Sequence, residues 1–238
     1  MTTETDNSRS YAPYMDIAIV FGGSMLAIWL EGLAVRSGAI AIASEASGIS
    51  GVLVGVIATL AVVYYRERNL RSLGFRKPER WATVPLWVVG ILGLYALAQS
   101  FLPPLISNFV EVPEPDISKY DAIVGNLGAA VSMALILPFT ASIPEEIIYR
   151  GFLIGRLEQI FGSSVRGSVL AVSLQALIFG LAHYQWGPGG MLITVFMGLI
   201  WGFGYILCGR NLWIVILAHS AGHLLFVYNL YTGGLAAQ

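Results

Sequence analysis

Long apolar runs separated by short polar stretches dominate this chain. A run of about 20 apolar residues is long enough to cross the hydrocarbon core of a bilayer as a helix, and about seven such runs can be distinguished. Residues 144–160 form either an additional helix or a continuation of the fourth run. The pattern therefore predicts an all-α, polytopic transmembrane helix bundle. The predicted spans cover residues 14–34, 47–65, 82–102, 122–143, 166–184, 189–208 and 211–230.

Composition indicates the same fold class. The chain has 238 residues, of which 56% are hydrophobic and 11% are charged, and its mean hydropathy is +0.73. A soluble domain carries about 25% charged residues, so we expect an integral membrane protein surrounded by the lipid bilayer. The net charge of −1 gives no reason to expect a nucleic-acid partner. The single cysteine, Cys208, excludes an internal disulfide and a cysteine-based metal cluster.

Two loops of opposite charge predict the orientation of the helices. Residues 66–80 form a basic loop, and short loops rich in Lys and Arg stay in the cytoplasm. Residues 103–121 form an acidic loop with four prolines, which we expect outside. Seven spans in the cell membrane then give a cytoplasmic N-terminus and an external C-terminus. The basic residues are Arg66, Arg68, Arg71, Arg76, Lys77 and Arg80, and the acidic ones are Glu111, Glu114, Asp116 and Asp121.

A pair of adjacent carboxylates, Glu145 and Glu146, follows an uncharged apolar run. Charge near a bilayer core is costly, so ionisable residues there are candidates for a functional site. On a helix, Glu146 and Arg150 share a face and can pair, whereas Glu145 is rotated by about 100° and is left free to act. The alternative is an ordinary helix start, in which Ser142 and Glu145 form a capping box. Residues 144–160 would then be an amphipathic interfacial helix with surface acids.

The three histidines, His183, His219 and His223, all lie in apolar runs after the carboxylate pair. His219 and His223 are four residues apart, so on a helix they lie one turn apart on one face. Such a pair can bind zinc if His183 or Glu145 completes the site. Glutamate and histidine can also perform acid/base chemistry, and a lone intramembrane histidine can simply pack. Residue counting puts His183 deeper than His219, so convergence requires shifted spans or a helix broken near Pro144.

In their order and spacing, these residues resemble the CPBP family of CAAX prenyl endopeptidases and bacteriocin-processing or immunity proteins. The family motifs are EExxxR, FxxxH and HxxxN, each on a transmembrane helix. The third motif departs from the pattern, because a histidine stands where asparagine is usual, although histidine can donate a similar hydrogen bond. The matching positions are Glu145, Glu146 and Arg150, then Phe179 and His183, then His219 and His223, with a similar Leu73-Gly74-Phe75 segment upstream.

The resemblance implies an intramembrane endopeptidase that cleaves peptide or prenylated CAAX-like, membrane-associated protein substrates. It implies that Glu145 is the general base that activates water, assisted by His183. His219 and His223 would polarise the scissile carbonyl or stabilise its oxyanion, while Glu146 and Arg150, with Phe179, would support the site. The corresponding domains are residues 1–120, N-terminal transmembrane helices with the basic cytoplasmic loop, and residues 121–230, the catalytic transmembrane domain.

Alternatives for both the cofactor and the function stay open at this point. The resemblance implies a glutamate-dependent reaction that requires no cofactor, yet the residues also permit zinc, with Glu145, His183, His219 and His223 as ligands. A non-catalytic immunity or scaffold protein that binds a peptide or partner is the main alternative to a protease. A transporter with a proton relay is a third hypothesis, but the paired inverted repeats that would support it are not evident in the sequence.

Overall fold

Helices make up every regular element in the part of the chain that the computed structural model describes, residues 4–41, 48–112 and 117–234. Seven helices are long and apolar enough to cross a membrane, which confirms the predicted all-α bundle and the number of spans. The spans are Ala12–Arg36, Ile49–Glu67, Trp81–Ile106, Leu127–Phe161, Val165–Ala182, Tyr184–Leu207 and Leu212–Tyr231.

The elements follow the spans closely. The α-helices are α1 (Glu4–Arg36), α2 (Ile49–Glu67), α3 (Val84–Ile106), α4 (Leu127–Leu137), α5 (Ile143–Glu145), α6 (Gly155–Phe161), α7 (Val165–Ala182), α8 (Gly187–Leu207) and α9 (Leu212–Tyr231). Two π-helical stretches are η5 (Pro138–Ser142) and η6 (Glu146–Ile154). Short 3₁₀ turns are η2 (Leu70–Leu73), η3 (Trp81–Thr83), η4 (Ser118–Ile123) and η7 (Tyr184–Trp186).

The fourth span is one helical run of 35 residues from α4 to α6, so residues 144–160 continue it. The capping-box alternative is wrong, because Ser142 has helical φ and ψ angles of −56° and −53° and makes no cap hydrogen bond. The interfacial alternative is also wrong, because Ile147, Ile148 and residues 152–154 are buried. A helix that is apolar on most sides packs at the centre of a bundle rather than along a membrane surface.

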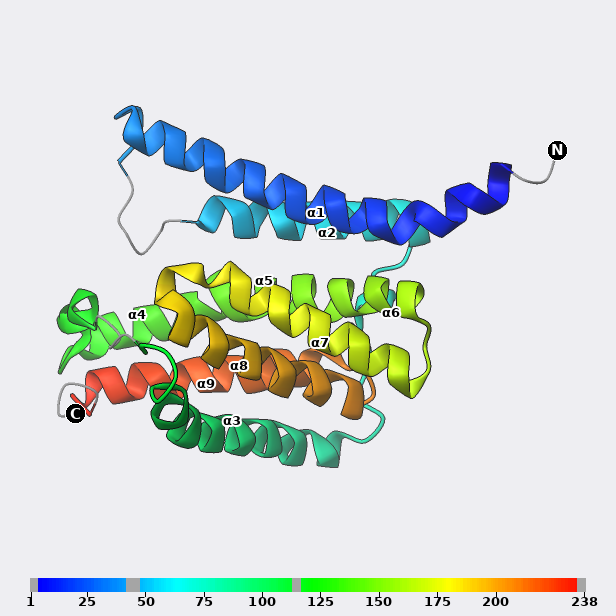
Figure 1. The fold of residues 1–238 in the computed structure, drawn as a ribbon. Helices are drawn as coiled ribbons and strands as arrows, with labels where there is room; N and C mark the ends of the chain where they lie inside the picture. The colour runs from blue at the N-terminus through cyan, green and yellow to red at the C-terminus, as the bar shows by residue number, and fades with distance from the viewer. Residues whose placement is uncertain (1–3, 42–47, 113–116, 235–238) are drawn as a thin grey trace.

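The helices form a pair and a larger group (Figure 1). Helix α1 packs along α2, and the pair joins the rest through α2 against η6 and α1 against α6. Within the larger group, α7 packs along α8, α3 packs on α8 and α9, and α4 packs on α9. The predicted division at residue 120 stays a prediction, and α3, which precedes it, contacts two helices that follow it.

Two glycines let α7 and α8 approach closely. A Cβ atom on Gly198 would lie 2.8 Å from the Cα of Ala176, and one on Gly202 would lie 2.7 Å from a methyl carbon of Val172. Small residues four apart permit such close backbone contact in lipid. The close packing fixes the end of α7, where His183 lies, against the start of α8.

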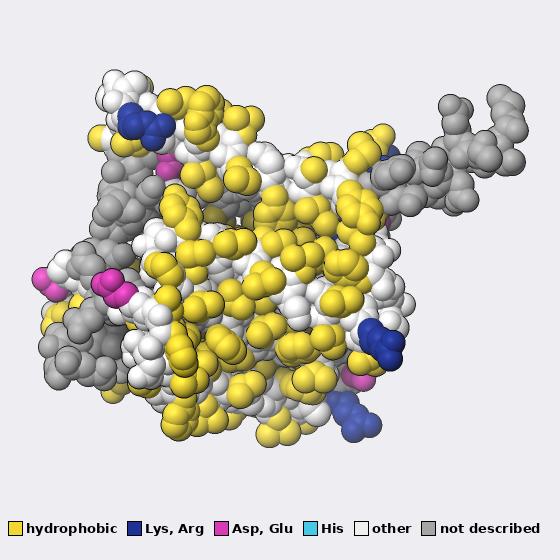
Figure 2. All heavy atoms as spheres, in the orientation of Figure 1, with side chains coloured by type: hydrophobic (Ala, Val, Ile, Leu, Met, Phe, Trp, Pro, Cys, Tyr) yellow, Lys and Arg dark blue, Asp and Glu magenta, His cyan; other side chains and the backbone are white. Residues whose placement is uncertain are grey.

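The surface agrees with a membrane environment. The face drawn in Figure 2 is largely apolar, and its charged side chains gather at the two ends. Large hydrophobic residues such as Leu86, Phe101 and Val165 are 73%, 68% and 82% exposed. Such a surface is stable only against lipid.

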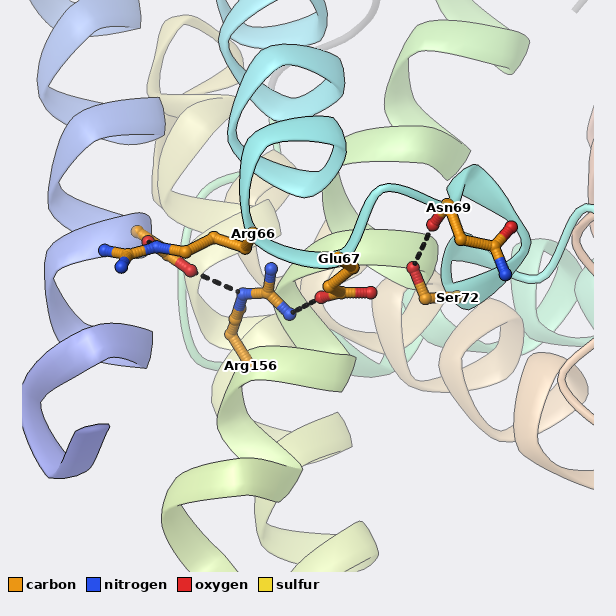
Figure 3. A network of polar contacts seen from close by, with 6 residues as sticks. Arg66, Glu67, Asn69, Ser72 and Arg156 are labelled. Atoms are coloured by element: carbon orange, nitrogen blue, oxygen red, sulfur yellow. Dashed lines mark hydrogen bonds and ion pairs between the residues drawn. The ribbon is translucent and has the colours of Figure 1, made fainter. Parts of the chain in front are cut away.

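One end of the bundle carries the basic residues. Arg156 of α6 donates to Asp16 of α1 at 3.0 Å and to Glu67 of α2 at 2.7 Å, and Arg66 donates to Asp16 at 3.1 Å. Figure 3 shows Arg156 reaching toward Glu67 from the fourth span. At the same end, Arg210 pairs with a carboxylate of α6. The network ties three spans together.

The Leu73-Gly74-Phe75 segment is anchored at this basic end. The carbonyl of Gly74 accepts a hydrogen bond from the Leu212 N–H at 2.9 Å, and Leu73 is 1% exposed. Gly74 has a φ of 95°, and a Cβ there would lie 2.6 Å from the Arg210 carbonyl oxygen. Both the positive φ and the lack of space require glycine. The segment therefore acts as a structural anchor between η6 and the turn from α8 to α9.

The acidic loop lies at the other end, where the backbone of Glu111 approaches Gly189 near the start of α8. Glu114 and Asp116 of that loop lie outside the described residues. The two loops therefore mark opposite ends of the bundle, as their charges suggested. Which end faces the cytoplasm stays a prediction.

Replacing Arg156 by Met should lower the free energy of unfolding in detergent by about 3 kcal/mol, because it leaves the buried Asp16 carboxylate with one partner instead of two. Denaturant titration followed by tryptophan fluorescence measures the change. The matched control is Arg66→Met. Because the Arg66 side chain is 38% exposed, this substitution should lower the free energy of unfolding by about 1 kcal/mol or less. Equal effects of the two substitutions would contradict a special role for Arg156.

Candidate functional site

Glu145 lies between the two π-helical stretches of the fourth span. Pro144 has no N–H group to donate along the helix, and the Ile143 N–H donates to the carbonyl of Pro138, five residues back. π-turns inside α-helices occur mostly as local insertions and are frequent at functional sites. The helix is therefore widened around the carboxylate pair, where the sequence allowed a break.

Glu146 is paired through one of its two carboxylate oxygens, and the other, Oε2, is buried without a hydrogen-bond partner among the described residues. One carboxylate oxygen, Oε1, accepts from Arg150 at 3.0 Å and from Nδ1 of His219 at 2.9 Å. Glu146 and Arg150 are 0% and 1% exposed, so both charges are removed from solvent and from lipid. A buried charge is tolerated when it is paired. Glu146 thus links the fourth span to α9.

Glu145 differs from its neighbour. Its side chain is half-buried and lines a cavity. Within the described part of the chain, no side chain forms a hydrogen bond or an ion pair with its carboxylate. The sequence-based expectation that one carboxylate pairs and the other remains available therefore agrees with the geometry.

His183 lies one residue beyond the end of α7, and its Nδ1 is 2.7 Å from the carbonyl oxygen of Phe179. A carbonyl only accepts hydrogen bonds, so Nδ1 carries the proton and Nε2 of the neutral ring is an acceptor. The Phe179 ring packs edge-on against His183, with centroids 4.7 Å apart, and the Arg150 guanidinium lies 4.6 Å from the same ring centroid. Phe179 therefore positions His183 and connects it to the ion pair.

His219 and His223 lie one turn apart on α9, with ring centroids 4.7 Å apart. Nδ1 of His219 donates to Glu146, so the ring is held against the fourth span. Nδ1 of His223 is 2.9 Å from the hydroxyl of Ser142. Each ring is thus fixed through Nδ1 by a different residue of the same helical run.

All four predicted site residues line one cavity of about 80 Å³, which has room for several water molecules. Residue counting places His183 deeper than His219. In the structure both histidines and Glu145, on the widened fourth span, line the same cavity. Glu146 lies behind the cavity wall. The lining residues are Glu145, Arg150, Phe179, His183, Trp186, Thr194, Met197, Trp201, His219 and His223.

Sequence reasoning missed the face of α8 that closes the cavity. Thr194, Met197 and Trp201 recur at the spacing i, i+3 and i+7, which places them on one helix face. That periodicity was visible in the sequence, but nothing in it distinguishes a cavity wall from ordinary packing. The role of Ser142 was also missed, because its position before Pro144 suggested a cap.

The zinc alternative can be tested against the donor geometry. No group of three His, Cys, Asp or Glu side chains in the described residues lies in an arrangement that could hold a metal ion. His183 and His219 each use Nδ1 for a contact within the protein and keep Nε2 available, an arrangement that metal-binding histidines also have, so the zinc alternative fails on the number of converging ligands alone. The residues therefore do not fit a zinc site of the usual three or four protein ligands.

Residues 127–225 match the model of the family described as type II CAAX prenyl endopeptidase, Rce1-like. This match confirms the family resemblance that the three motifs indicated. It supports CAAX-type intramembrane protease activity at the level of the family. Neither the curated proteins nor the solved structures contain a match.

The two carboxylates should respond differently to substitution. Arg150→Met should lower the free energy of unfolding by about 3–5 kcal/mol, because it leaves Glu146 buried without its cation. Glu145→Gln should change it by about 0.5 kcal/mol or less, since its carboxylate has no partner to lose. Thermal unfolding in lipid nanodiscs measures both. A larger loss for Glu145→Gln than for Arg150→Met would show that the assignment is reversed.

Proposed function

From the premise that residues 127–225 belong to the Rce1-like family of type II CAAX prenyl endopeptidases, we propose that this protein is a glutamate-dependent intramembrane endopeptidase. Its substrates are peptide segments embedded in or anchored to the membrane, and the orientation of the bundle, taken up below, decides whether cytoplasmic prenylated CAAX-like proteins are among them. The proposal is supported above all by one contrast. One carboxylate oxygen of Glu146 accepts from both Arg150 and His219, whereas Glu145 lines the cavity and has no hydrogen-bond or ion-pair partner among the described residues.

The first chemical step uses the two proton acceptors of the cavity. The Glu145 carboxylate takes a proton from a water molecule, and the water oxygen forms a bond to the scissile carbonyl carbon. Nε2 of His183 has its lone pair available, because Nδ1 donates to the Phe179 carbonyl. His183 therefore orients the attacking water and shares the proton. The carbonyl π electrons move onto the oxygen, which becomes an oxyanion.

Collapse of this intermediate completes the cleavage. The carbonyl re-forms, the carbon–nitrogen bond breaks, and the departing nitrogen receives the proton that Glu145 took from water. His223, which also lines the cavity, supplies a hydrogen-bond donor for the oxyanion. His219 adds a second donor from Nε2 only in its protonated form, because its Nδ1–H already donates to Glu146. Donors held in place before the reaction stabilise developing charge most effectively in a site with little water.

No metal is needed for these steps, and the donor geometry favours a reaction without one. Glu146 and Arg150 act as positioning residues, since their ion pair fixes the helix that carries Glu145 and the ring of His219. Phe179 supports His183 in the same way, through its carbonyl and its ring. This division assigns a role to every residue of the three motifs.

Glu145→Gln should abolish proteolysis while the protein still accumulates in membranes, with a loss of about 10²–10⁴-fold, the usual contribution of a general base. The measurement compares new protein termini in membranes of cells that express the wild type or the variant. His183→Ala should reduce the same set of cleavages. Purified protein in liposomes, offered a farnesylated CAAX peptide and its unprenylated counterpart, then tests whether the lipid is required.

Asn108→Asp, an exposed change at a residue that does not line the cavity, serves as the control and should cleave as the wild type does. Cleavage should persist in the presence of a chelator. Termini that do not depend on Glu145 would reject the protease and favour the non-catalytic role, a membrane protein that binds a peptide or partner. Stoichiometric zinc with chelator-sensitive cleavage would reject the metal-free mechanism.

We further propose that the basic end is cytoplasmic, in the cell membrane, by the positive-inside rule. His183 and Trp186 lie at the turn from α7 to α8, toward the end where Glu111 lies. In this orientation, a substrate approaches from the outer half of the bilayer. A cytoplasmic prenylated tail would need the reverse orientation, so orientation separates the two substrate classes.

The single natural cysteine makes this orientation measurable. In a Cys208→Ser background, Asn108→Cys should react with a membrane-impermeant maleimide on intact cells, because Asn108 is exposed near the acidic loop. Lys77→Cys, exposed in the basic loop, should react only after permeabilisation. The reverse pattern would overturn the proposed orientation and favour cytoplasmic substrates.

A further inference from the structure

Ser142 forms an unusual hydrogen bond for a serine inside a helix. Helical serines commonly donate to the carbonyl four residues back, and Ser24 and Ser132 do so here, at 2.9 Å and 2.8 Å. The corresponding carbonyl for Ser142 is that of Pro138, which accepts from the Ile143 N–H in the π-turn. The hydroxyl of Ser142 instead lies 2.9 Å from Nδ1 of His223.

The direction of this hydrogen bond follows from burial. Ser142 is 0% exposed, and His223 is its only side-chain hydrogen-bond partner among the described residues. A buried hydroxyl that accepted from an Nδ1–H group would leave its own proton without an acceptor, and buried polar groups are rarely left unpaired. The Ser142 O–H therefore donates to Nδ1, which must be unprotonated to accept it.

The consequence appears at the opposite edge of the ring. A neutral histidine with an unprotonated Nδ1 carries its proton on Nε2. His223 lines the cavity and Ser142 does not, so the Nδ1 edge faces away from the cavity and the Nε2 edge faces it. His183 is in the opposite state, since its Nδ1 donates to a carbonyl. His183 thus presents an acceptor to the cavity and His223 presents a donor, while His219, whose Nδ1 donates to Glu146, is in the same state as His183 when neutral.

We propose that Ser142 is a positioning residue that holds His223 as the Nε2–H tautomer, which makes His223 a hydrogen-bond donor to the oxyanion of the scissile carbonyl. This inference rests on the proposed proteolysis for its catalytic part, and on the hydrogen bond alone for the tautomer. It assigns a function to the histidine at the third motif, where the family pattern has asparagine. The side-chain amide of asparagine donates without any tautomer to be fixed.

A double-mutant cycle tests the catalytic part. Ser142→Ala should lower kcat at least about tenfold with little change in KM, because His223 keeps its ring but is no longer held as the Nε2–H tautomer. For comparison, complete removal of an oxyanion donor lowers kcat about 10²–10³-fold. In a His223→Asn background, which needs no tautomer, Ser142→Ala should change kcat less than about twofold. Equal losses in both backgrounds would overturn the proposal, because a purely structural serine gives that result. Melting temperatures of all four proteins confirm that they fold.

Nitrogen-15 NMR of histidine-labelled protein in nanodiscs tests the tautomer independently of activity. His223 should show an unprotonated Nδ1 and a protonated Nε2, and His183 should show the reverse. Ser142→Ala should shift His223 alone. Substitution of each histidine in turn assigns its signals. A protonated Nδ1 in neutral His223 would overturn the inference. The expected tautomers without any Glu145-dependent cleavage would instead overturn the proposed function and the oxyanion role with it.

Discussion

The buried ion pair between Glu146 and Arg150 is the constraint on which the site depends. Two charges at 0% and 1% exposure inside an apolar bundle are tolerable only while they remain paired. Each partner also holds a second group: Glu146 accepts from His219 of α9, and Arg150 lies over the ring of Phe179 of α7. One electrostatic requirement in the fourth span thereby fixes His219 on α9 and, through Phe179, His183 just beyond the end of α7.

The π-helical stretches explain how adjacent glutamates come to have different environments. A regular helix through Pro144 would lose a backbone hydrogen bond and suffer a clash with the preceding turn. The chain instead widens on both sides of Glu145 and remains helical over 35 residues. Glu146 and the residues after it turn into the core, while Glu145 stays at the cavity. Within the same segment, the hydroxyl of Ser142 pairs with His223.

The sequence predicted the seven spans and the residues that meet at the cavity, because apolar run length and motif spacing are local features. It could not decide between a cap and a continuous helix at Ser142, since serine followed by proline and glutamate is typical of a helix start. Only packing of residues 147–154 against other spans makes that segment a core helix. The contact between Ser142 and His223 spans 81 residues, and the wall of α8 resembles ordinary packing in sequence. Both depend on tertiary structure.

The histidines illustrate how one residue type acquires opposite roles from what lies behind it. His183 and His223 each use Nδ1 for a contact within the protein, but the partner is a carbonyl in one case and a hydroxyl in the other. The carbonyl forces a proton onto Nδ1 and leaves an acceptor at the cavity, whereas the hydroxyl supplies the proton and leaves a donor there. Motif residues alone therefore do not determine chemistry here. The groups behind them, the Phe179 carbonyl in one case and Ser142, which lies outside the motifs, in the other, decide which ring can accept a proton and which can stabilise negative charge.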